Sequence, residues 1–114
     1  MYLYVLQSKF NAETKAAPLP APSTSSGKLY ALGGCDGDYL STVQVFNGER
    51  WQSVPSMATK RSGLAAAVLG GKLHALGGYD GSNRSNTVEV FDGERWQPAP
   101  SMPTERSSLA AAVF

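Results

Sequence analysis

Few side chains in this sequence are suited to covalent or metal chemistry. His74 is the sole histidine and Cys35 the sole cysteine, and no second metal ligand recurs near His74. Zinc sites need three or four such ligands, and a reactive thiol needs a cationic neighbour or a second cysteine. Asp36 and Asp38 share a short segment, but Ser82 replaces Asp38 where that segment recurs. These residues favour a chain without enzymatic activity, metal or cofactor.

Two glycine pairs, Gly33-Gly34 and Gly77-Gly78, resemble parts of a phosphate-binding loop in composition. A P-loop, however, places a Lys-Ser or Lys-Thr pair and a helix directly after its glycines. Neither follows either pair in this sequence. Close packing at an irregular strand end explains the two pairs better than phosphate binding does.

The overall composition excludes several classes of protein. The 114 residues are 42% hydrophobic and 17% charged, which is too apolar for a chain that is disordered throughout. A net charge of +1 predicts neither a nucleic-acid partner nor an anionic membrane partner. One cysteine excludes an intrachain disulfide framework. The opening segment lacks a basic region and a cleavage site for a signal peptide, so a cytoplasmic or nuclear location is expected.

The composition changes sharply near Ser26. All twelve glycines lie between Gly27 and Gly93, whereas residues 1–26 carry three spaced prolines and a run of Ser and Thr. Such a segment favours extended, solvated backbone, so residues 1–26 are predicted to form a leader or linker. The alternative is a degenerate partial repeat, because residues 2–6 have the character of a strand.

An internal repeat occupies the remainder of the chain. Residues 27–37 recur at 71–81 with nine of eleven positions identical. Residues 42–69 then match 87–114 at twenty of 28 positions. Similarity at a fixed period indicates that each copy is one structural unit stacked on the next. Two units are therefore predicted, over residues 27–70 and 71–114.

Three strands of each unit follow from simple patterns. A short run at residues 28–32 ends at the glycine pair, and residues 42–46 alternate between valines on one face and Thr, Gln and Phe on the other. Asn47-Gly48 signals a type I′ turn, with positive φ at both residues, into a strand that begins at Trp51. The second unit repeats these patterns over residues 72–76, 87–91 and from Trp96 onward.

The fourth segment, residues 64–69 and its copy 109–114, is compatible with either a helix or a strand. Leu-Ala-Ala-Ala-Val has good helix propensity, and a serine precedes it at a plausible cap. A helix of six or seven residues is marginal in water, and Gly70-Gly71 stops the first copy at once. Small residues also suit a strand where neighbouring sheets converge. Strands are therefore predicted at both positions.

Both units resemble the kelch motif. Its features are a strand that ends in Gly-Gly, an aromatic residue before a turn, a Trp after it, and a Met-x-x-x-Arg stretch. These features stand here as Gly33-Gly34, Phe46, Trp51 and Met57 with Arg61, and again as Gly77-Gly78, Phe91, Trp96 and Met102 with Arg106. The resemblance covers residues 27–114 and implies an all-β fold of four-stranded antiparallel β-propeller blades.

The kelch register names the four strands a to d from the propeller axis outward. In that register the chain holds strands b-c-d, one complete blade over residues 64–99, and a lone strand a at 109–114. Two blades cannot close a ring, since propellers have about 4–8. The chain is therefore expected to be a fragment of a longer kelch protein without independent function, a truncated or mispredicted gene product, or a homo-oligomer. In the oligomer the lone strand would pair with the b-c-d sheet of another copy.

The resemblance also implies a protein-binding role. Kelch proteins commonly capture substrates for ubiquitin ligases or bind the cytoskeleton, including actin. The BTB and BACK segments that mark ligase adaptors are not recognised in this sequence. Some kelch-type propellers are copper radical oxidases, but their Tyr/His/Cys ligand set needs more than one His and one Cys.

Recognition is expected on the face of the blades that carries the b–c and d–a connections. The b–c loops, residues 36–41 and 80–86, are where the two units diverge, and variable loops carry specificity. In relatives that act as ligase adaptors, arginines on the d–a connections hold acidic peptide motifs. The alternative role for each Arg is to tie its connection to adjacent backbone. The predicted partner-binding residues are Tyr39, Arg61, Tyr79, Asn83, Arg84 and Arg106.

Overall fold

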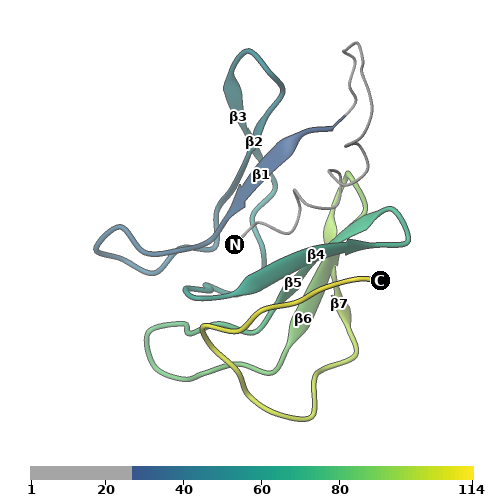
Figure 1. The fold of residues 1–114 in the computed structure, drawn as a ribbon. Coiled ribbons are helices and arrows are strands. Elements are labelled where there is room, and N and C mark those ends of the chain that lie inside the picture. The colour runs from purple at the N-terminus through teal and green to yellow at the C-terminus, as the bar shows by residue number, and fades with distance from the viewer. Residues whose placement is uncertain (1–26) are drawn as a thin grey trace.

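The computed structural model describes residues 27–114, and both expectations for residues 1–26 lie outside the described residues. The described part consists of two antiparallel sheets (Figure 1). The first sheet holds, in order, β1 (Leu29–Leu32), β2 (Val43–Phe46) and β3 (Trp51–Val54). The second holds β4 (Ala65–Leu69), β5 (Lys72–Leu76), β6 (Val88–Phe91) and β7 (Trp96–Ala99).

This topology confirms the all-β prediction and the order of the strands. Each sheet is a meander in which sequential strands pair, as strands b-c-d in the first sheet and a-b-c-d in the second. The ambiguous segment at residues 64–69 is a strand, because β4 pairs with β5 over its whole length. Ala65 and Ala67 point into the protein and are buried, so the small residues occupy a position where space is short.

The strand predicted at residues 109–114 is not formed, and that prediction is wrong. Within residues 27–114, this segment has no partner with which its backbone groups could form a ladder. A strand depends on paired N–H and C=O groups and not on the strand propensity of its own residues. The identical Leu-Ala-Ala-Ala-Val sequence becomes β4 only because β5 lies beside it.

The hairpins after β2 and β6 form as predicted, but their turns are not of type I′. Phe46 pairs with Trp51, so four residues connect the two strands instead of two. Ser108 is the one non-glycine among residues 27–114 with positive φ, and Asn47 therefore lacks the φ that a type I′ turn needs. Asn47 Oδ1 instead accepts hydrogen bonds from the backbone N–H groups of Glu49 (2.8 Å) and Arg50 (3.1 Å). The turn is therefore stabilised by the Asn47 side chain and not by a positive φ at Asn47.

The core lies between the two sheets. Val43, Met57 and Ala75 form its fully buried centre, and Ala75 comes from the opposite sheet to Val43. The rings of Tyr30 and Phe91 meet edge to face across the boundary, with 6.3 Å between centroids. Each blade therefore covers one face of its neighbour, as expected for stacked repeats.

The two tryptophans stand at equivalent positions and differ in what they contact. Trp96 Nε1 donates a hydrogen bond to the carbonyl oxygen of Pro55 in the other unit, at 2.8 Å. Trp51 is 47% exposed.

We expect Trp96→Phe to lower the free energy of unfolding by about 1 kcal/mol through loss of the hydrogen bond to Pro55. The matched variant Trp51→Phe is expected to change it by less than about 0.5 kcal/mol. Urea denaturation followed by circular dichroism measures both, and equal losses would contradict the assignment.

Candidate functional site

An open polar groove of about 530 Å³ lies beside the b–c loop of the second blade. This loop and the b–c loop of the first blade, residues 36–41, project from the same side of the two sheets (Figure 1). The d–a connections close the groove on its other flank. Its lining is mostly hydroxyl and amide groups with one cation and one anion: Ser62, Gly63, Tyr79, Ser82, Asn83, Arg84, Glu105, Ser107 and Ser108.

Backbone and side-chain hydrogen bonds fix the loop that forms this groove. Asp80 Oδ1 accepts from the N–H groups of Ser82 (2.7 Å) and Asn83 (2.8 Å). The hydrogen bonds from Asn83 and Ser82 hold the pKa of Asp80 below its usual value of 3.8. Asp80 therefore stays ionised at neutral pH. Tyr79 exchanges backbone hydrogen bonds with Ser62, at 2.8 and 2.9 Å, and joins the loop to the d–a connection.

The two b–c loops contact each other through their tyrosines. The rings of Tyr39 and Tyr79 meet at 77°, with 5.5 Å between centroids. A Cβ placed on Gly81 would lie 2.9 Å from the Tyr39 ring, so the second loop rests directly on that ring. Tyr39 is not among the groove residues, and it supports the wall that Tyr79 forms. Tyr79, Asn83 and Arg84 are thus the predicted residues that the structure gathers around the groove.

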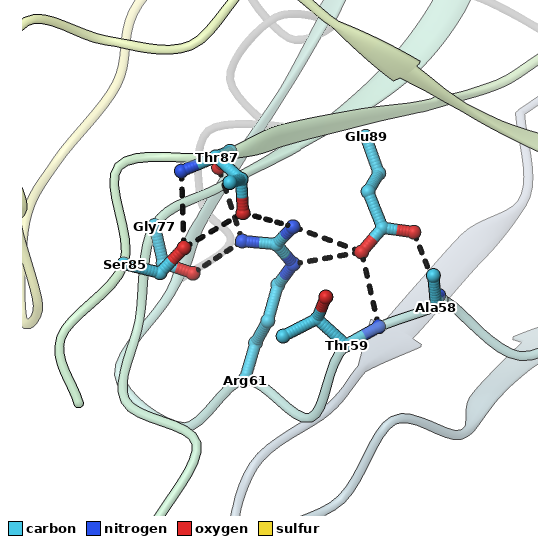
Figure 2. Close-up of polar contacts among 7 residues, drawn as sticks. All are labelled: Ala58, Thr59, Arg61, Gly77, Ser85, Thr87 and Glu89. Carbon is cyan, nitrogen blue, oxygen red and sulfur yellow. Dashed lines mark hydrogen bonds and ion pairs between the residues drawn. The ribbon is translucent and has the colours of Figure 1, made fainter. Parts of the chain in front are cut away.

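Arg61 is fully buried, with 0% exposure, so its side chain cannot contact a partner. Its Nη1 donates to the carbonyl oxygens of Gly77 (2.8 Å) and Thr87 (3.0 Å), and Nη2 donates to Thr87 Oγ1 at 2.9 Å (Figure 2). Nε and Nη2 also donate to Glu89 Oε2, at 3.2 and 2.8 Å. The alternative role holds for this residue: Arg61 ties its d–a connection to the next blade. The prediction that Arg61 contacts a partner is therefore wrong for this residue.

Glu89 is the residue of this network that the sequence analysis missed. It lies in β6, is 5% exposed, and accepts from the backbone N–H groups of Ala58 (2.7 Å) and Thr59 (3.2 Å) in addition to Arg61. The sequence does contain a signal for it: Glu89 in β6 stands where the otherwise matching strand β2 has the uncharged Gln44. A buried carboxylate is stable only when its oxygens are paired in this manner.

Comparison with known families decides the identity of the repeats. The family model described as Kelch motif matches residues 19–58 and 60–103. The chain belongs to the kelch repeat family. A search of curated proteins returned no match. Kelch repeats generally mediate protein–protein interaction, so the chain carries the architecture of an interaction module.

Arg106 stands where Arg61 stands in the other kelch repeat, yet its environment differs. Its backbone repeats the contacts of Arg61: its carbonyl accepts from Gly78 N–H at 2.8 Å and its N–H donates to Ser85 O at 3.0 Å. Its side chain is exposed, because within residues 27–114 no further blade follows to cover it. Arg106 is also not one of the groove residues. It lies on the open end of the kelch stack and not in the loop site.

Residues 27–114 contain no group of three or more His, Cys, Asp or Glu side chains that could hold a metal ion. They also form no helix long and apolar enough to cross a membrane. Cys35 is exposed, with a free thiol, directly before the first b–c loop. Asp36, beside it, accepts from the N–H of Asp38 at 3.0 Å and thereby shapes the turn.

Proposed function

We propose that this kelch chain is a non-catalytic interaction module that binds a protein partner in the polar groove beside the second b–c loop. The observation that carries the proposal is the convergence of Tyr79, Asn83 and Arg84 with the d–a connections around one open groove. These residues lie where the two repeats differ, whereas the hairpin turns at the opposite end are nearly identical. Loops held on a rigid scaffold vary without disturbing the fold, which suits recognition.

The chemistry of the groove fits a peptide segment with an acidic side chain. Serine hydroxyls and the Asn83 amide supply hydrogen bonds to peptide backbone, and Arg84 supplies the charge-assisted contact. Arg84, and not an arginine of the d–a connections, would therefore bind the acidic side chain, because Arg61 is buried and Arg106 lies outside the groove. Substrate capture for a ubiquitin ligase and attachment to actin or another cytoskeletal protein are the cytoplasmic roles that such binding would serve.

The groove is tested with random peptides displayed on phage and selected on the wild-type chain. Enriched peptides are expected to carry Asp or Glu, and Arg84→Ala is expected to weaken their binding by about tenfold through loss of a charge-assisted contact. Fluorescence anisotropy with the synthetic peptides measures the change. Arg50→Ala, an exposed arginine on a hairpin turn, is the matched control and is expected to leave binding unchanged. Enrichment of peptides that bind the Arg84→Ala variant equally well would contradict the proposal, as would failure to enrich any.

A second copy of this chain is the alternative partner, although its docking would place Gln44 and not a carboxylate against Arg106. Within residues 27–114, β1 has no neighbour on its outer side, and an apolar cleft of about 460 Å³ lies between β1 and the second sheet. The unpaired segment at residues 109–114 has the sequence of β4 and the length to add a strand there. Light scattering distinguishes the alternatives, because a closed ring of six blades would have three times the 12.1 kDa mass of one chain.

A further inference from the structure

The junction between the two blades has a donor side and an acceptor side. The donor side is the d–a connection, which contributes the Arg61 guanidinium and the N–H groups of Ala58 and Thr59. The acceptor side is the next blade, which contributes the carbonyl of Gly77, the carbonyl and hydroxyl of Thr87, and the Glu89 carboxylate. Every named donor atom meets an acceptor, and the buried cation meets the buried anion.

Each half of this junction recurs, unfilled, at one end of the described part of the chain. Arg106 carries the donor half on the second d–a connection, with its side chain exposed. The acceptor half lies on the first sheet as Gly33, Thr42 and Gln44, and the last two are exposed. The second glycine of each glycine pair shows the difference. A Cβ on Gly78 would lie 3.1 Å from Arg61 Cβ, whereas a Cβ on Gly34 would meet nothing within 4 Å among the described residues.

The two open halves do not match each other in charge. Docking a second copy head to tail would bring Gln44, and not a carboxylate, against Arg106. The guanidinium would then be buried without a counter-ion, although the carbonyls of Gly33 and Thr42 would still accept from it. A buried charge that loses its partner is strongly destabilising, whereas the same pair left intact is tolerated.

A second charge mismatch lies beside the first. Asp80 has its pKa lowered by hydrogen bonds from Asn83 and Ser82 and further by the positive charge of Lys60 on the incoming connection. The second connection has Glu105 at the position of Lys60. If a second copy docked head to tail, Glu105 of one chain would meet the loop that holds Asp36 and Asp38 of the other chain. The attraction between Lys60 and Asp80 would thus be replaced by repulsion between carboxylates. Like charges placed together are a known means of rejecting a wrong partner.

We propose that the open face around Arg106 docks a kelch blade that carries a carboxylate at the position of Glu89, and that it rejects a second copy of this chain. Arg106 would donate to that carboxylate as Arg61 does to Glu89, and Thr104 N–H would replace Thr59 N–H. Pro103 stands in place of Ala58 and has no N–H, so the incoming carboxylate receives one hydrogen bond fewer. The inference concerns the end of the blade stack, and of the residues it uses only Glu105 also lines the loop groove.

The test gives the first blade of this chain the carboxylate that the proposal requires opposite Arg106. The probe is the Gln44→Glu/Arg106→Gln variant, which presents the carboxylate and lacks a donor face of its own, and the control is Arg106→Gln alone. Each is titrated into wild-type chain labelled with a dye at Cys35, the sole cysteine, and binding is followed by anisotropy. The probe should bind about tenfold more tightly than the control, as expected for a new charge-assisted contact.

Two further arms keep the result specific to the junction. Labelled Arg106→Gln chain should lose the gain, because its donor face is neutral. Labelled Glu105→Lys chain should bind both titrants several-fold more tightly than wild type does, since it replaces repulsion with attraction. Gln44 and Glu105 are exposed, so variants at these positions are expected to keep the wild-type circular dichroism and thermal midpoint. Equal affinity of the two titrants, binding of neither, or wild-type self-association as tight as the matched pair would each overturn the proposal.

Discussion

Arg61→Ala is expected to lower the free energy of unfolding by about 3–5 kcal/mol, the cost of leaving one partner of a buried ion pair alone. The loss would strand the Glu89 carboxylate, which is 5% exposed, with the N–H groups of Ala58 and Thr59 as its remaining donors. It would also remove every side-chain bond between the d–a connection and Thr87. Small domains are stable by only about 5–15 kcal/mol, so this change is a large share of the total. Guanidinium denaturation followed by circular dichroism measures it.

The repeat supplies an internal control for this prediction. Arg106→Ala removes the same side chain from the equivalent connection, but Arg106 is exposed, so the effect is expected to stay within about 0.5 kcal/mol. A double variant, Arg61→Met with Glu89→Leu, removes both charges together and is expected to recover most of the loss. Similar losses for Arg61→Ala and Arg106→Ala would show that the ion pair does not hold the two blades together.

The strands were predictable because their signals are local. The alternation of Val43 with Gln44 and Val45 sets which face is buried, and the glycine pair sets where the strand before it ends. Repetition then extends the same assignment to the second copy. The segment at 109–114 shows the limit of that argument, since the same residues form β4 only where a neighbouring strand is present.

The site was predictable only in part, because pairing across a blade boundary is not a local property. Arg61 and Arg106 share the same Met-x-x-x-Arg-Ser pattern, and what separates a buried structural arginine from an exposed one is the blade that follows. Glu89 lies 28 residues from Arg61 along the chain, so no local spacing connects them. Tyr79, Asn83 and Arg84 were predicted as binding residues from the opposite signal, the divergence of the two b–c loops, because variation marks surface that the scaffold does not constrain.

Gly33→Ala is the second change with a large expected effect. Gly33 has φ of +58°, and a Cβ at this position would overlap the carbonyl oxygen of Arg61. That carbonyl accepts the Gly34 N–H at 2.8 Å, so the contact cannot open without loss of a hydrogen bond between the glycine pair and the d–a connection. Left-handed backbone alone costs an alanine about 1–2 kcal/mol. With the overlap added, a total loss of about 3 kcal/mol or more is expected, comparable to other severe backbone and packing changes.

Gly48→Ala separates the two causes of that loss. Gly48 has φ of +104°, and a Cβ there would meet nothing within 4 Å in the described part of the chain, so it reports backbone strain without overlap. Its φ is less accessible to alanine than that of Gly33, so strain alone predicts the larger loss for Gly48→Ala. Close packing of the glycine pair predicts the reverse order. Thermal denaturation of the two variants decides between them, and a larger loss for Gly48→Ala would mean that the pair serves the backbone conformation and not the approach of the Arg61 connection.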